Sequence, residues 1–153
     1  MHFDYGNNIS LCETPSETLA NLLPYAIACH LKDMAVEHYE DGFLLSEVPL
    51  GEGILDLKGM TAALRKKDPN IPLDLEMITR DPLKIPIFTD GYWVTFDNAY
   101  SPISGHEMAR LVELVSKHPP KHPLPRTTGL GAEVQLKLED DCIAKSIAYA
   151  RNL

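Results

Sequence analysis

The sequence predicts a single α/β domain in which parallel strands alternate with helices. Strand-like and helix-like segments alternate over residues 1–77, the order expected when helical crossovers join parallel strands. Two segments with Ser/Thr-x-x-Glu spacing mark the starts of helices. The length of 153 residues, with 44% hydrophobic and 24% charged residues, suits one globular domain.

Three segments of the first half have strand patterns. Residues 1–5 alternate apolar and polar side chains, and residues 26–31 are almost all apolar, like a strand covered on both faces. Residues 71–77 follow the turn signal at 68–70 and form the third predicted strand. We expect these strands to lie side by side in one parallel sheet.

Two helices are predicted between these strands. Thr14 and Glu17 have capping-box spacing, and the helix that they begin should end near Pro24. Asp56 can cap a second helix that runs to Lys67. The intervening residues 33–53 have no clear pattern and are expected to form a long irregular loop of the functional or mobile kind.

The second half is predicted to be helical around a linker. A Pro-rich loop is expected at 81–88, a short helix at 92–94 and a longer helix from the capping box of Ser104. Residues 118–131 contain four prolines and should form a linker. A last helix is expected at 139–152, with the acidic residues 139–141 in its first turn.

Charge and cysteine content exclude several classes of function. The chain has 14 Lys+Arg and 22 Asp+Glu, a net charge of −8, which argues against binding of nucleic acid. Its longest apolar run is far shorter than the about 20 residues of a membrane-spanning helix. Cys12, Cys29 and Cys142 form no Cys-x-x-Cys pair, so neither thiolate zinc nor a disulfide framework is expected. Free thiols and the lack of a signal-peptide pattern in residues 1–8 favour a cytoplasmic protein.

Three polar residues stand at the carboxyl ends of the three predicted strands. They are Asp4, His30 and Glu76. Functional sites of parallel α/β folds form at these strand ends. Two carboxylates with one imidazole suit Mn²⁺, Mg²⁺, Co²⁺ or Zn²⁺, so the sequence predicts a site for one divalent metal.

Each residue also has a purely structural interpretation. Asp4 can close the following turn, and a single histidine such as His30 is often part of a core. Glu76 can pair with Lys84 or Arg80 on the surface. The common position of Asp4, His30 and Glu76 at strand ends favours the shared site.

Four segments resemble the last three strands of the sugar phosphate isomerase/epimerase family, the xylose isomerase-like TIM barrels. They read FDYGNN, HLKD, VPLGEGILD and PLDLEMITRDP and lie within residues 1–88, and the final helix IAKSIAYARNL is similar to that family's C-terminal helix. The resemblance implies that residues 1–153 form the C-terminal portion of a (β/α)₈ barrel, a partial domain with a βαβαβ unit at 1–88 and helices at 89–153.

The resemblance also implies an activity and roles for residues. Asp4, His30 and Glu76 would bind the metal, and Glu76 would act as acid and base in proton transfer or hydride shift on a sugar or polyol. Asn7 matches a polar position near the substrate. Lys32 and Asp33 would orient the histidine or the substrate, with a surface ion pair between them as the alternative.

The chain departs from the family in its length. A complete barrel takes about 250 residues, so the first five strands, and with them one metal-binding Glu, are expected to be missing. Val36 stands where some relatives have a substrate-binding Arg. We therefore expect the C-terminal part of such an isomerase or epimerase, arising by truncation, gene splitting or an internal start, with a second copy or a complementing chain as its expected partner. The alternative is a non-catalytic half-barrel that serves as a subunit or interaction module.

Other candidate sites are weaker. A three-zinc nuclease of the same superfamily would need a histidine at position 7 and a basic surface. His118 and His122 lie in the Pro-rich segment, where no helix can align them, so a solvated linker is favoured. Residues 51–53 are too few to cradle a phosphate and predict a turn into the next helix.

Overall fold

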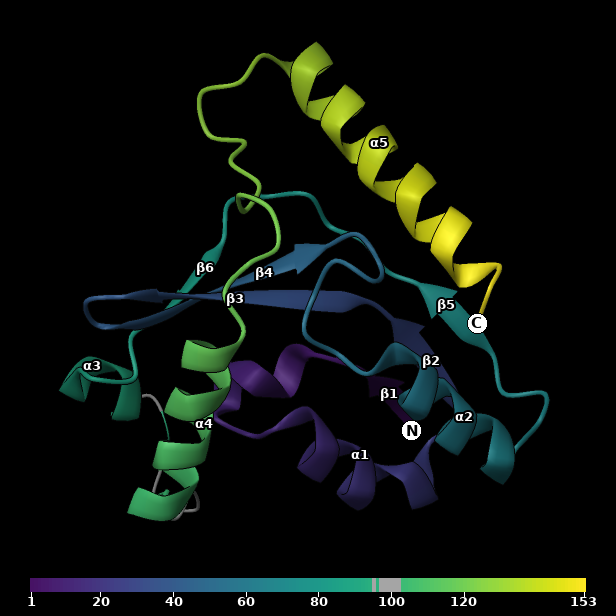
Figure 1. Ribbon diagram of the computed structural model, residues 1–153, viewed down its shortest axis with the longest axis horizontal. Helices are drawn as coiled ribbons and strands as arrows, with labels where there is room; N and C mark the ends of the chain where they lie inside the picture. Colours follow the sequence, from purple (N-terminus) through teal and green to yellow (C-terminus); the bar gives the residue numbers. More distant parts are fainter. Residues whose placement is uncertain (95, 97–102) are drawn as a thin grey trace.

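The computed structural model describes residues 1–94, 96 and 103–153. Its described part is a mixed α/β fold with two sheets (Figure 1). The parallel sheet contains β1 (His2–Asp4), β2 (Ala28–Leu31) and β5 (Leu73–Leu75), in the order β1-β2-β5. The antiparallel sheet contains β3 (Asp33–Tyr39), β4 (Gly42–Val48) and β6 (Leu83–Ile85), in the order β3-β4-β6. The three predicted parallel strands are therefore present.

The helices of the first half begin where the sequence predicted. Helix α1 (Pro15–Leu22) has a complete capping box between Thr14 and Glu17, and the short 3₁₀ helix η2 (Leu23–Tyr25) follows it. A second 3₁₀ helix, η1 (Asn7–Leu11), connects β1 to α1. Asp56 caps α2 (Leu57–Lys67). The last turn of α2 carries three basic residues, whose positive charges interact favourably with the negative end of the helix dipole.

The prediction of an irregular loop at 33–53 is wrong. Residues 33–48 form the hairpin of β3 and β4, which turns between Tyr39 and Gly42. All seven residues of β4 are buried, so the strand lacks the alternation of apolar and polar residues that marks a half-exposed strand. The predicted loop at 81–88 also contains a strand, β6, which pairs with β4.

The second half is helical, as predicted, but its last helix begins earlier. The short α3 spans Asp90–Trp93, and the capping box of Ser104 begins α4 (Gly105–Lys117). Residues 118–131 contain neither helix nor strand, which confirms the linker. Helix α5 spans Ala132–Ala150, so residues 139–141 lie in its middle and Glu133 is the acidic residue of its first turn. Strong helix formers at 132–138 extend the helix toward the linker.

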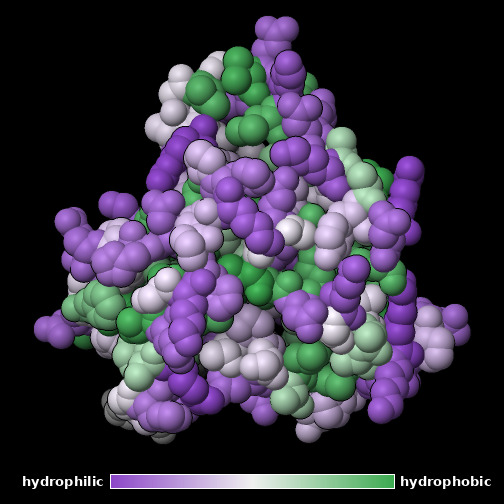
Figure 2. Space-filling view, viewed as in Figure 1, coloured by the Kyte–Doolittle hydropathy of each residue, from purple (hydrophilic) through white to green (hydrophobic). Residues whose placement is uncertain are grey.

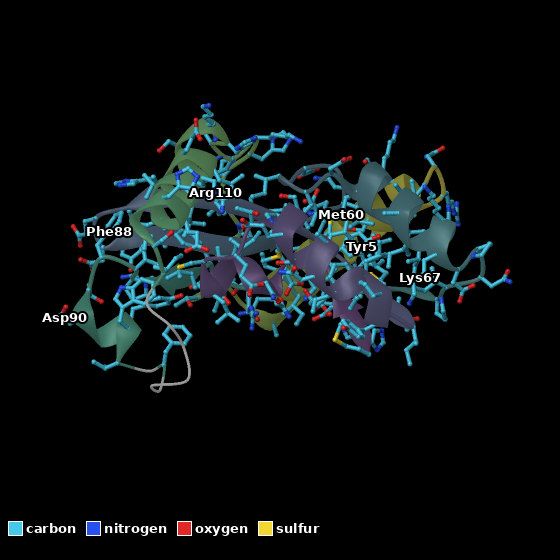
Figure 3. All side chains as sticks on the ribbon, turned by 90° about the horizontal axis from the view of Figure 1, so that it is seen from below. Tyr5, Met60, Lys67, Phe88, Asp90 and Arg110 are labelled. Carbon is cyan, nitrogen blue, oxygen red and sulfur yellow. The ribbon has the colours of Figure 1, made fainter. Side chains whose placement is uncertain are left out.

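One hydrophobic core joins the two sheets to the helices below them. Helices α1, α2 and α4 lie on one side of the strands in Figure 1, and α5 lies on the other. The largest fully buried apolar side chains of this core include Phe3, Tyr5, Phe43, Leu45, Leu64 and Leu111. Figure 3 labels Tyr5 and Met60 in the middle of the molecule, where both belong to this core. The Tyr5 and Thr61 hydroxyl groups are hydrogen-bonded at 2.9 Å.

Helix α5 is anchored mainly at its C-terminal half. The Ser146 hydroxyl accepts a hydrogen bond from the Leu50 amide at 3.2 Å, and Tyr149 packs against Gly51. Figure 2 shows polar side chains over most of the visible face, with an apolar group near the top. Leu130, Val134 and Leu136 are exposed at this end of α5, which extends past the sheets.

Candidate metal centre

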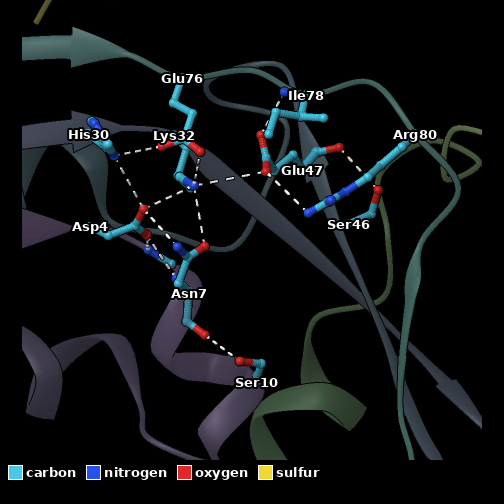
Figure 4. A network of polar contacts seen from close by, with 11 residues as sticks. Asp4, Asn7, Ser10, His30, Lys32, Ser46, Glu47, Glu76, Ile78 and Arg80 are labelled. Carbon is cyan, nitrogen blue, oxygen red and sulfur yellow. Dashed lines mark hydrogen bonds and ion pairs between the residues drawn. The ribbon is translucent and has the colours of Figure 1, made fainter.

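The parallel sheet brings Asp4, His30 and Glu76 together. Asp4 and His30 are directly paired between β1 and β2, and alternation along each strand directs both side chains to the same face. The Glu76 amide donates to the Leu31 carbonyl at 3.0 Å, which extends the ladder one residue beyond β5. One ligand atom from each of the three side chains lies within 4.8 Å of the other two (Figure 4).

Asp4 closes the turn that its sequence position suggested, and its second carboxylate oxygen faces His30. Its Oδ1 accepts hydrogen bonds from the Gly6 amide at 3.0 Å and the Asn7 amide at 2.9 Å, which closes the turn after β1. Its Oδ2 faces the cluster and lies 3.8 Å from His30 Nδ1. The turn therefore fixes the carboxylate, so that one oxygen is held toward His30 and Glu76.

Lys32 lies in the centre of this cluster. Its ammonium group is 3.0 Å from Asp4 Oδ2 and 2.9 Å from Glu76 Oε1, and it donates to Asn7 Oδ1 at 3.2 Å. The side chain is only 1% exposed, so the alternative of a surface ion pair with Asp33 is wrong. Burial opposes the charge of Lys32, but its contacts with Glu76 and Asp4 outweigh burial and raise its pKa.

Asp33 does not join the site. It follows Lys32 in an extended chain, so its side chain points to the opposite face. Its Oδ2 accepts from the amides of Gly51 and Gly53, both at 2.9 Å. Its Oδ1 accepts from the amides of Met34 at 2.9 Å and of Leu55 at 3.2 Å. Asp33 therefore fixes the 51–55 turn, although burial raises its pKa despite these four donors.

Glu76 pairs with neither of the surface partners considered from the sequence. Its Oε1 contacts Lys32, and its Oε2 lies 2.8 Å from His30 Nδ1. The contact with His30 lacks hydrogen-bond geometry, and Oε2 is buried without a hydrogen-bond donor among the described residues. A buried carboxylate oxygen without a donor is unfavourable unless another positive group approaches it.

Glu47 belongs to the cluster, and the sequence did not reveal it. Its side chain, on β4, is only 4% exposed, and its Oε2 accepts from the Ile78 amide at 2.7 Å. Its Oε1 lies 3.9 Å from both Lys32 Nζ and Arg80 Nη2. Burial raises the pKa of Glu47. The sequence showed no sign that residues 42–48 form a strand, so the position of the Glu47 side chain beside Lys32 became clear only with the hairpin of β3 and β4.

The donor set fits a divalent metal. His30 Nδ1 and Glu76 Oε2 are 2.8 Å apart, and Asp4 Oδ2, 3.8 Å from the same nitrogen, completes a mixed nitrogen and oxygen set. Lys32 compensates one of the two carboxylate charges, which reduces the attraction for a cation. The three side chains could hold a metal ion, and the Lys32 ammonium group competes with it for the same carboxylates.

The remaining sequence candidates lie elsewhere. Within the described ranges, Asp4, His30 and Glu76 are the one group of three side chains placed closely enough to hold a metal ion, so His118 and His122 form no such group. All three cysteines are buried and free. Residues 51–53 form the predicted turn, and Val36 is fully buried in β3.

Comparisons with family models, curated proteins and solved structures found no match for this chain. In the described ranges, no helix combines the length and the apolar character that crossing a bilayer requires.

Proposed function

We propose that the chain is part of a metal-dependent isomerase or epimerase that acts on a sugar or polyol. The observation that carries this proposal is the convergence of His30 Nδ1, Asp4 Oδ2 and Glu76 Oε2 at the ends of parallel strands. Carboxyl ends of parallel strands are the usual position of active sites in α/β barrels. Mn²⁺, Mg²⁺, Co²⁺ or Zn²⁺ bound there would polarise neighbouring oxygens of the substrate.

In this proposal the side chains have separate tasks. Glu76 takes a proton from, or returns it to, the carbon beside a substrate carbonyl, or holds the substrate during a hydride shift. Lys32 keeps the Asp4 and Glu76 carboxylates in place through its two contacts at 3.0 and 2.9 Å. Asn7 lies between these residues and a neighbouring cavity, so its amide can orient substrate hydroxyl groups.

The sheet order supports a barrel origin for this site. Strands β1, β2 and β5 are parallel neighbours, as successive strands of a (β/α)₈ barrel are, although the hairpin of β3 and β4 separates β2 from β5 along the chain. Helix α1 connects the first two of these strands, and α2 precedes the third. We propose a cytoplasmic protein in which this sheet is part of such a barrel.

A second candidate function follows from the sheet edges. Among the described residues, β1 and β5 each pair with one neighbour only, so each has an open edge. Open edges of parallel strands favour pairing with another chain. This observation supports a half-barrel that acts as a subunit or interaction module, completed by a second copy or a complementing chain.

Titration of Mn²⁺ into the purified chain, with light scattering on the same sample, tests both candidates. The metal proposal predicts about one ion per chain, and His30→Ala should weaken binding by at least about tenfold because a direct ligand is lost. His38→Ala is the matched control, since His38 is exposed on β3. Unchanged affinity in His30→Ala would refute the metal centre, and an oligomer without Mn²⁺ binding would favour the module.

A further inference from the structure

A cavity lies directly beside the proposed metal centre. It has a volume of about 330 Å³, at the lower end of the about 300–1,000 Å³ that is usual for small-molecule sites. The polar side chains that line it are Asn7, Ser10, Ser46, Glu47, Arg80 and Asp81. Asn7 belongs to both places, since its amide group contacts Asp4 and Lys32. A molecule that reaches the centre can therefore extend into this cavity.

The lining offers both donors and acceptors of hydrogen bonds. Arg80 is half exposed, and its guanidinium group is 3.9 Å from Glu47, too far for a hydrogen bond. The hydroxyl groups of Ser10 and Ser46 donate to the carbonyls of Asn7 and Glu47, so their lone pairs are left as acceptors. Hydroxyl groups of a ligand both donate and accept, which matches this mixture.

The charges of the cavity disfavour an anionic ligand. Glu47 and Asp81 are acidic, and Arg80 is the single basic residue of the lining. Hydrogen bonds from Thr128 and Thr127 hold the pKa of Asp81 below its ordinary range, so its carboxylate stays ionised. The chain as a whole carries a net charge of −8, which adds to the repulsion of anions.

We propose that the cavity of Glu47, Arg80 and Asp81 binds hydroxyl groups of an uncharged polyol and rejects the corresponding phosphate ester. Arg80 donates to hydroxyl oxygens, and the Glu47 carboxylate accepts from hydroxyl protons on the other side. The inference rests on the proposed function, because it extends the substrate from the metal centre into the cavity. It selects, within sugars and polyols, the non-phosphorylated members.

Ligand-observed NMR with paired probes tests this inference. D-Fructose is compared with D-fructose 6-phosphate, and D-ribose with D-ribose 5-phosphate, at equal concentrations with the full chain. The neutral member of at least one pair should bind, and its phosphate ester should bind at least about tenfold more weakly because of charge repulsion. Arg80→Gln should weaken binding of the neutral sugar about tenfold through loss of its donors.

Asp81→Asn isolates the effect of charge. The Thr127 and Thr128 amides and the Thr127 hydroxyl group donate to Asp81 Oδ1, and an asparagine keeps such an oxygen. This variant should bind the phosphate ester more tightly by about threefold or more, with little change for the neutral sugar. Lys145→Gln is the control, because Lys145 pairs with Glu52 on the surface and does not line this cavity.

The outcomes separate this inference from the proposed function. Binding of Mn²⁺ together with failure of all four probes to bind would refute the polyol cavity and leave the metal centre. Equal or tighter binding of a phosphate ester would also refute the inference. Binding of a neutral sugar that depends on Arg80, without binding of Mn²⁺, would support the cavity and refute the metal centre.

Discussion

Replacement of Lys32 by methionine should destabilise the protein strongly. The ammonium group contacts Asp4 Oδ2 at 3.0 Å, Glu76 Oε1 at 2.9 Å and Asn7 Oδ1 at 3.2 Å. Lys32→Met keeps an unbranched apolar stem in the same space, so packing changes little. The variant leaves two carboxylates facing each other without the cation that bridges them.

The expected loss of unfolding free energy is about 3 kcal/mol. Removal of one partner of a buried ion pair costs about 3–5 kcal/mol. The side chains of Asp4 and Glu76 are 19% and 27% exposed, so water compensates part of their charge, and the lower end of this range applies. A loss of this size is a large fraction of the about 5–15 kcal/mol that stabilises a typical domain.

Urea unfolding at neutral pH measures this loss, with Lys145→Met as the matched control. Lys145 pairs with Glu52 at 3.3 Å, but its side chain is 60% exposed, so the control should lose no more than about 1 kcal/mol. Added Mn²⁺ should restore more stability to Lys32→Met than to the original chain, because a cation then replaces the missing ammonium.

A loss in Lys32→Met as small as that in Lys145→Met would refute this reasoning. It would mean that the Lys32 ammonium stabilises the fold no more than an exposed ion pair does. Equal stabilisation of both proteins by Mn²⁺ would instead contradict the view that the ammonium and a metal share the same carboxylates.

Two further variants test single carboxylates. Burial raises the pKa of the Glu47 carboxyl group above its ordinary value of 4.5, so the folded chain holds the carboxyl proton more tightly than the unfolded chain does. The free energy of unfolding should therefore fall as the pH rises from 4.5 through the raised pKa of the folded chain. Glu47→Gln should flatten this fall in pH-dependent thermal unfolding, whereas Glu139→Gln, an exposed control on α5, should keep it. Asp33→Asn should cost about 2–4 kcal/mol, because the Gly51 and Gly53 amides would lose their shared acceptor. Limited proteolysis at 51–55 should accelerate in Asp33→Asn, and an unchanged digestion pattern would contradict the role of Asp33 in fixing this turn.

Local signals in the sequence were sufficient for the elements that depend on neighbouring residues. The capping boxes at Thr14 and Ser104 begin α1 and α4 as predicted, because a cap is completed within four residues of chain. The three parallel strands were also visible, and with them the shared position of Asp4, His30 and Glu76. The convergence of these side chains was predictable because the ends of parallel strands meet at one edge of the sheet.

Contacts between distant residues decided the rest. The hairpin of β3 and β4 was missed because β4 is buried along its whole length, and its burial depends on β6 and the helices rather than on its own pattern. The position of Glu47 followed from this hairpin. The sequence by itself thus determined which residues end the parallel strands and can serve as ligands. Only the tertiary structure decided that a buried ammonium lies among them, because the carboxylates that neutralise it come from three separate segments of the chain.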